Sequence, residues 1–126
     1  MKKKINIYLF LVVILVFLII KGAGRFNDNN TGKQDFRNTS HLILTKHARC
    51  RMDCRQITMD EIKEILKNGH LNTAKSGIGA KGDNTYALDG YSLEKQHIRV
   101  VVAPENNGLV VITCIDLDKE WQCDCN

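Results

Sequence analysis

His47-Ala-Arg-Cys-Arg-Met-Asp-Cys-Arg55 is the stretch that most strongly decides how this chain folds. It holds a histidine, three arginines and two of the five cysteines. In an α-helix, side chains return to the same face every three to four residues. The residues that then share one face are His47, Cys50, Arg51, Cys54 and Arg55, with Ala48 and Met52 along its apolar edge. We therefore predict a helix that ends near Gln56 and carries the chemically active face of the domain.

The residues that follow specify a second helix. Thr58 followed three residues later by Glu61 is the capping-box pattern, in which each side chain bonds to the other residue's backbone N–H. Apolar side chains then recur at helical spacing as far as Leu66, and Gly69 is a typical helix end. The pattern predicts a helix over residues 59–68.

After this helix the apolar period changes to two residues, which is typical of β-strands. The strands that this pattern predicts cover residues 70–75, 85–91, 96–103 and 109–117. Asn107-Gly108, between the last two, supplies the positive φ of a hairpin turn. The short run 41–45 fits either a strand or the lead-in to the first helix. The predicted fold class is α+β, with two helices packed on a small, mainly antiparallel sheet of three to four strands.

The N-terminal part reads as a positive flank, residues 1–4, and a membrane-directed segment, residues 5–24. The run from Ile5 to Ile20 is almost entirely apolar, and we predict that it contacts membrane lipid. Lys21 directly after the run favours an uncleaved transmembrane helix, whereas the small residues 22–24 fit the alternative, a cleaved signal peptide. The lysines before the run predict a single-pass topology, with the N-terminus inside and the C-terminal domain outside the cytoplasm, periplasmic or extracellular.

Residues 25–40 are polar and predict a flexible linker, so the small α+β domain with its cysteine-rich tail is expected over residues 41–126. Residues 1–40 carry seven Lys or Arg and two Asp, a surplus of +5, so the net charge of +4 leaves −1 for residues 41–126. A domain that is not basic is a poor match for nucleic acid. We expect instead a protein or small-ligand partner of unknown identity.

The cysteines form two closely spaced pairs, Cys50 with Cys54 and Cys123 with Cys125, and leave Cys114 over. Residues four apart on a helix have Cβ atoms about 5–6 Å apart, which is too far for a disulfide. An extended Cys-x-Cys tail presents its side chains at a spacing of about 6.5–7 Å, close to one helical turn. We therefore predict two disulfides between helix and tail, as Cys50–Cys125 with Cys54–Cys123 or as the other pairing. We therefore expect no cofactor. The alternatives to the disulfides are a zinc ion held by the same four residues and free thiols. Cys114 is expected to be a buried apolar residue.

Several motifs resemble those of a bacterial domain family of unknown function. The resemblance covers about residues 41–117, from a T-x-H-A-x-x-R-M-x-x-R-x-I-T opening to Tyr86-x-Leu88-x-Gly90 and Val110-Val-Ile-Thr113. The residues that match the opening are Thr45, His47, Ala48, Arg51, Met52, Arg55, Ile57 and Thr58. In element order the family is similar to RelE/barnase-like toxin domains, which are small RNA-cleaving α+β proteins. The tail, Trp121 to Cys125, lies outside the shared pattern.

The similarity to toxin domains implies candidate catalytic residues. His47 is the candidate general acid or base for attack of a 2′-hydroxyl on a phosphodiester, and Arg51 and Arg55 are the candidates for stabilising the charge that develops. His97 and Arg99, on the sheet, are second candidates.

Four interpretations of the domain follow. We favour a membrane-anchored binding or interaction domain outside the cytoplasm, because the domain is slightly acidic and RNA is not a normal extracytoplasmic substrate. An RNA-cleaving toxin-type enzyme is the alternative, and a zinc-binding domain facing the cytoplasm is a third hypothesis. A purely structural role also fits the histidine and arginines, through bonds to Asp116, Asp118 or backbone carbonyls.

Overall fold

The computed structural model describes residues 2–22 and 35–125, in a chain that divides into two units, residues 1–33 and 34–126. The first unit contains one helix, α1 (Lys2–Gly22). Its apolar side chains from Ile7 to Phe17 are exposed to solvent. Most of the predicted linker lies in residues 23–34, outside the described residues.

The predicted transmembrane helix is not supported. In the part of the chain that the structure describes, no helix combines the length and the apolar character needed to cross a membrane.

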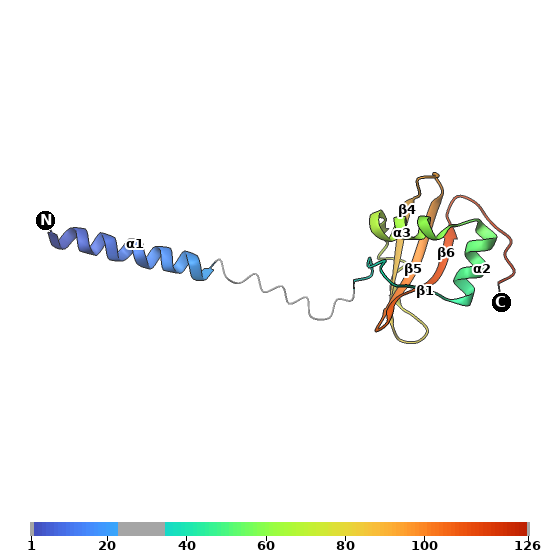
Figure 1. The fold of residues 1–126 in the computed structure, drawn as a ribbon, viewed down its shortest axis with the longest axis horizontal. Coiled ribbons are helices and arrows are strands. Elements are labelled where there is room, and N and C mark those ends of the chain that lie inside the picture. The colour runs from blue at the N-terminus through green and yellow to red at the C-terminus, as the bar shows by residue number, and fades with distance from the viewer. Residues whose placement is uncertain (1, 23–34, 126) are drawn as a thin grey trace. The chain divides into compact units, whose positions relative to one another are not determined.

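The second unit is a mixed α+β domain (Figure 1). Its elements in chain order are β1 (Leu42–Leu44), α2 (Lys46–Arg55), α3 (Met59–Asn68), β2 (His70–Leu71), β3 (Gly77–Ile78), β4 (Asn84–Tyr91), β5 (His97–Glu105) and β6 (Gly108–Asp116). The strands lie in the order β1-β6-β5-β4-β2, and β3 pairs with β4. The α+β class is confirmed. The sheet has six strands rather than the predicted three to four.

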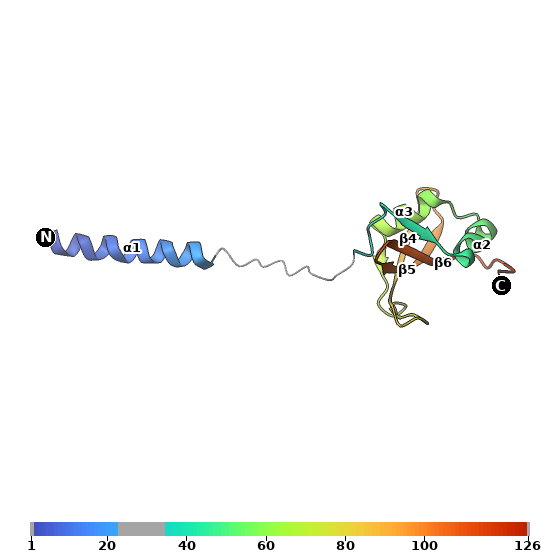
Figure 2. The same cartoon turned by 60° about the horizontal axis from the view of Figure 1, so that its bottom comes forward.

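The additional strands are short and lie beside the longer ones. β1 runs next to β6 (Figure 2) and pairs with it in parallel, with Leu42 opposite Leu109. The predicted strand over residues 70–75 is only the two residues of β2, because the chain turns after Asn72, where Lys75 N donates to the Asn72 carbonyl at 3.2 Å. The other pairings, β4 with β5 and β5 with β6, are antiparallel as predicted.

One apolar core lies between the helices and the sheet. Ile98, Val100 and Val102 alternate along β5 and are fully buried, which is the period-two pattern of a strand with one covered face. Ile62 and Leu66 of α3 pack against them in the same cluster. α3 has the bounds that the sequence predicts, and the capping box of Thr58 and Glu61 is present at its start.

The domain begins earlier than the predicted boundary at residue 41. The Phe36 ring stacks on Tyr86 with a centroid distance of 4.4 Å. Arg37 Nη1 donates to the carbonyls of Leu66, Lys67 and Gly69 at 3.0–3.3 Å, and so bonds to carbonyls at the end of α3 that lack helical partners. The end of the predicted linker is therefore part of the packed domain.

The β5–β6 turn differs in register from the predicted turn. Glu105 pairs with Gly108, so the two turn residues are Asn106 and Asn107. Among these residues only Gly108 has a positive φ, 146°, and a Cβ there would lie 2.5 Å from the His41 carbonyl oxygen. Glycine is required because β1 approaches the turn at this point.

Candidate functional site: the α2 face beneath the C-terminal tail

α2 is fixed at both ends but buries little. Thr45 Oγ1 accepts a hydrogen bond from the Ala48 amide at 2.9 Å and donates one to the Ile112 carbonyl at 3.1 Å. Gln56 ends the helix in the left-handed conformation, with φ 56°. Only Ala48 and Met52 are buried, so most side chains of the helix point away from the core.

Two disulfides join α2 to the tail, residues 119–125. Cys50 is bonded to Cys125 and Cys54 to Cys123, and each Cα–Cα distance is 5.8 Å. This is the first of the two predicted pairings. In the tail the two cysteines are half-buried, while the intervening Asp124 is exposed, as expected for an extended segment with alternating sides. Figure 1 shows the C-terminal end lying beside α2.

His47 is engaged at both ring nitrogens. Nδ1 lies 3.2 Å from the Cys125 carbonyl oxygen, and Nε2 lies 3.3 Å from Nε of Arg51. A carbonyl can only accept and an arginine N–H can only donate, so the pair of contacts requires a neutral ring with its proton on Nδ1. Both ring nitrogens therefore have a hydrogen-bond partner.

Arg55 lies deeper than Arg51. Its Nη1 donates to the carbonyl of Cys114 in β6. Burial lowers the pKa of the Arg55 guanidinium, and the neighbouring charge of Arg51 lowers it further, partly offset by the Asp116 carboxylate. The two arginines therefore repel each other and favour an anion near both.

Asp116, at the end of β6, links the sheet to the tail. Its Oδ2 accepts from Gln96 Nε2 and from the ring N–H of Trp121, both at 2.9 Å. Its Oδ1 accepts the backbone N–H groups of Asp118 and Lys119. Burial raises the pKa of Asp116, but these hydrogen bonds outweigh burial and hold it below its usual value. Neither Asp116 nor Asp118 forms the ion pair with α2 that the structural interpretation expected.

The basic charge of α2 is not neutralised within the described residues. Four basic side chains against one acid give this helix +3, in a domain of net charge −1. The basic residues are Lys46, Arg49, Arg51 and Arg55. In the described range 35–125, the ion pairs join Asp60 to Lys63, Asp118 to His97 and Asp89 to Arg99, and none includes α2.

The structure does not bring His97 and Arg99 to the α2 face. His97 pairs with Asp118 at 3.1 Å and stacks on Tyr91. Arg99 binds Asp89 through two hydrogen bonds of 2.6 and 2.7 Å. The bond from Arg99 lowers the pKa of Asp89 below its usual value, despite burial. Each side chain therefore has a carboxylate partner on the sheet or just after it.

A family model described as a domain of unknown function, DUF4258, matches residues 44–116. The chain belongs to the DUF4258 family. Searches of curated proteins and of solved structures found no match. The predicted membership of a family of unknown function is confirmed, whereas similarity to RelE-like toxins stays a prediction.

The DUF4258 match ends at β6. It includes Cys50 and Cys54 of α2 but neither tail cysteine. The two disulfides therefore tie a segment outside the matched region onto the family domain. Within the described residues, no group of three or more His, Cys, Asp or Glu side chains is placed to hold a metal ion.

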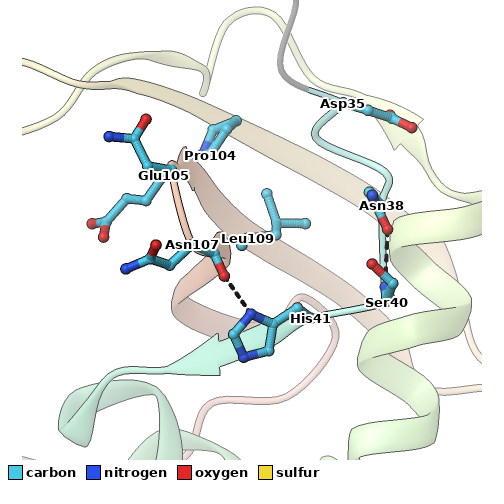
Figure 3. Close-up of a pocket in the computed structure, with 10 residues that line it drawn as sticks. Asp35, Asn38, Ser40, His41, Pro104, Glu105, Asn107 and Leu109 are labelled. Atoms are coloured by element: carbon cyan, nitrogen blue, oxygen red, sulfur yellow. Dashed lines mark hydrogen bonds between the residues drawn. The ribbon is translucent and has the colours of Figure 1, made fainter.

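The DUF4258 domain also contains a cavity that was not predicted from the sequence. A polar cavity of about 360 Å³ lies between the start of β1 and the β5–β6 turn (Figure 3). His41 Nδ1 contacts the Asn107 carbonyl oxygen across it, and Ser40 N donates to Asn38 Oδ1 at 3.0 Å. The residues come from segments more than sixty positions apart, so no local motif marks the cavity.

Proposed function

We propose that this DUF4258 domain is a binding module for an anionic ligand, that it works outside the cytoplasm, and that α2 is its contact surface. The observation that carries the proposal is the pair of disulfides between α2 and the tail. Disulfides of this kind persist in oxidising compartments. The apolar segment from Ile5 to Ile20 supports delivery of the domain to or across a membrane.

The class of ligand follows from charge. α2 concentrates +3 in a domain that is otherwise acidic, and within the described residues none of its basic side chains is in an ion pair. Arg51 and Arg55 are close enough for the charge of one to lower the pKa of the other. Guanidinium groups bind carboxylate and phosphate through paired hydrogen bonds, so an anion with several oxygens fits this surface.

The compartment is tested by the thiol state of the full chain in the cells that make it. Cells are quenched in acid, and free thiols are alkylated under denaturing conditions before mass spectrometry. We expect one modified cysteine, Cys114, and five after prior reduction. Five alkylated cysteines without reduction would contradict the proposal, and so would zinc bound to the purified protein, which is the result expected for a cytoplasmic zinc domain.

The ligand class is tested with inorganic phosphate. The full chain in detergent is titrated while the amide signals of α2 are followed by NMR, in the oxidised and in the reduced protein. We expect saturable shifts in at least one state, weakened about tenfold in Arg51→Gln/Arg55→Gln. Lys63→Gln/Lys67→Gln on α3 is the matched control with the same charge change. If both variants bound phosphate equally weakly, the net charge of the domain alone would attract phosphate, and the proposal of an α2 site would be contradicted.

RNA cleavage by His47 with Arg51 and Arg55 is the second candidate function. The contact between His47 and Arg51, at 3.3 Å, favours it, since a toxin-type site needs a base and a cation together. The full chain is incubated with a synthetic RNA in both redox states. Cleavage that disappears in folded His47→Ala and Arg51→Ala would replace the binding module with an enzyme.

A further inference from the structure

We propose that the tail, residues 119–125, is a strap that reduction of its two disulfides releases from the His47 face. The inference rests on the proposed function, because the strap controls access to the same basic surface of α2. Oxidised protein is the closed form. Protein whose tail disulfides have been reduced is the open form.

The two disulfides are placed where a reductant can reach them. Cys50, Cys54, Cys123 and Cys125 are each half-buried at the surface of the domain, between α2 and the chain's end. Cys114, by contrast, has no exposed surface, and burial raises the pKa of its thiol to about 11. Reduction therefore acts on the tail disulfides while Cys114 stays an inert part of the core.

The hydrophobic core of the domain forms without the tail. The cluster of buried apolar residues is built from α2, α3 and strands β4 to β6, with no member from residues 119–125. The contacts that dock the tail include the Trp121 N–H bond to Asp116 Oδ2, at 2.9 Å, and the Cys125 carbonyl oxygen, 3.2 Å from His47 Nδ1. These contacts are at the surface, so the tail can leave while the domain remains folded.

The covalent step is thiol–disulfide exchange with a dithiol, such as a Cys-x-x-Cys oxidoreductase. One thiolate of the dithiol attacks a sulfur of Cys54–Cys123 and forms a mixed disulfide, and the other sulfur leaves as a thiolate. The second thiol of the reductant then resolves the mixed disulfide. Two electrons and two protons pass to the pair, which becomes two thiols, and the dithiol becomes a disulfide. A second dithiol reduces Cys50–Cys125 in the same way.

Release changes the bonding of His47. In the closed form the Cys125 carbonyl accepts from Nδ1 and the Arg51 N–H donates to Nε2. Once the tail leaves, Nδ1 loses its acceptor, and only the Arg51 contact at Nε2 still favours a proton on Nδ1. That contact is lost as well when Arg51 turns toward an anion together with Arg55. The open form therefore presents His47 without its contact to the tail, beside Arg51 and Arg55.

The test uses the full chain and its Cys123→Ser/Cys125→Ser variant, which is open without any reductant. Gln122→Ser, in the same tail, keeps both disulfides and the charge and is the matched control. Two quantities are measured, the tautomer of the His47 ring from its nitrogen chemical shifts and the affinity for inorganic phosphate. Far-UV circular dichroism verifies that each protein is folded.

We expect the closed protein and the control to hold the proton on Nδ1. The open variant and the reduced protein should lose this preference and bind phosphate at least about tenfold more tightly. An unchanged tautomer with equal affinity in both forms would overturn the strap and leave the binding surface intact. A changed tautomer without phosphate binding in either form would support the strap and overturn the anionic ligand instead.

Discussion

α2 and α3 are helices of ten residues that follow each other in the chain, yet different forces hold them. α3 buries Ile62, Ile65 and Leu66 in the core and starts with a capping box. α2 buries only Ala48 and Met52, and two disulfides attach its outer part to the tail. Burial of apolar surface stabilises α3, whereas cross-linking compensates for the small buried surface of α2.

The difference shows how a small domain keeps a polar helix in place. A helix that faces outward with basic side chains gains little from the hydrophobic effect. Two bonds to a segment distant in sequence restrict it without covering its charges with apolar residues. The domain thus divides into a core that α3 completes and a surface that α2 presents.

The largest expected effect is removal of both cross-links. Cys50→Ser/Cys54→Ser should lower the free energy of unfolding by roughly 4–6 kcal/mol. Most of this comes from one long loop, of 69 or 75 residues, because the second bond then closes only a short ring. Denaturant unfolding measures it, with Arg49→Ser/Asp53→Ser on exposed positions of α2 as control. A loss below about 1 kcal/mol would remove the basis of the comparison.

The next effect is expected on the other helix. Leu66 is fully buried, so Leu66→Ala should lower the free energy of unfolding by about 2–5 kcal/mol. The loss should be the same in oxidised and reduced protein, because α3 does not contact the disulfides. Lys67→Ala, one exposed residue further, is the control. A loss that depends strongly on reduction would mean that the two helices are not independently held.

A smaller effect on stability is expected when acid protonates Asp116, which joins the sheet to the tail. Hydrogen bonds hold the pKa of Asp116 below its usual value, so its contribution is present above about pH 4 and is lost as pH falls through the folded-state pKa. Asp116→Asn should cost about 1–2 kcal/mol at pH 7 and flatten the fall in stability below pH 4. Asp53→Asn, on an exposed part of α2, serves as control. Thermal unfolding across pH 2–7 measures both, and equal acid slopes in wild type and Asp116→Asn would contradict the assignment.

The smallest effects compare the two N-caps. Thr58→Ala and Thr45→Ala should each lower the free energy of unfolding by about 1 kcal/mol, because each removes an acceptor for an amide of the first turn. Both hydroxyls also donate, Thr58 to Glu61 Oε2 within its own helix and Thr45 to the Ile112 carbonyl of β6. Because Thr45 joins the helix to the sheet, its loss should be the larger of the two. The corresponding serine variants should recover most of the stability. A larger loss of stability in Thr58→Ala would contradict this order and would mean that the capping box with Glu61 contributes more than the bond from Thr45 to β6.

The sequence predicted the features that depend on residues close together in the chain. The bounds of α3 follow from its capping box and apolar period. The spacing of the cysteines predicted that those of the helix bond to those of the tail, but it left open which of the two pairings forms. The parallel partner of β1 was not predictable, because three residues carry too little pattern to separate a strand from a lead-in. The contacts of Phe36 and Arg37 were not predicted, because the surrounding sequence is polar and these two residues are held only by tertiary contacts.

The sequence predicted which residues form the candidate site but not their hydrogen-bond partners. The residues on the α2 face follow from helical periodicity, and they lie together as expected. Their partners do not, since His47 and Arg55 bond to backbone carbonyls, which no sequence pattern distinguishes. Arg99 was a candidate by residue type alone, and its pairing with Asp89 depends on the register of β4 against β5.

Hydrogen exchange of the full chain, with and without a dithiol reductant, tests most directly the claim that α2 is held by the tail and α3 by the core. Reduction should speed exchange of the α2 amides, residues 46–55, at least about tenfold more than exchange of the α3 amides, residues 59–68. Equal acceleration in both helices, or none in α2, would contradict the account.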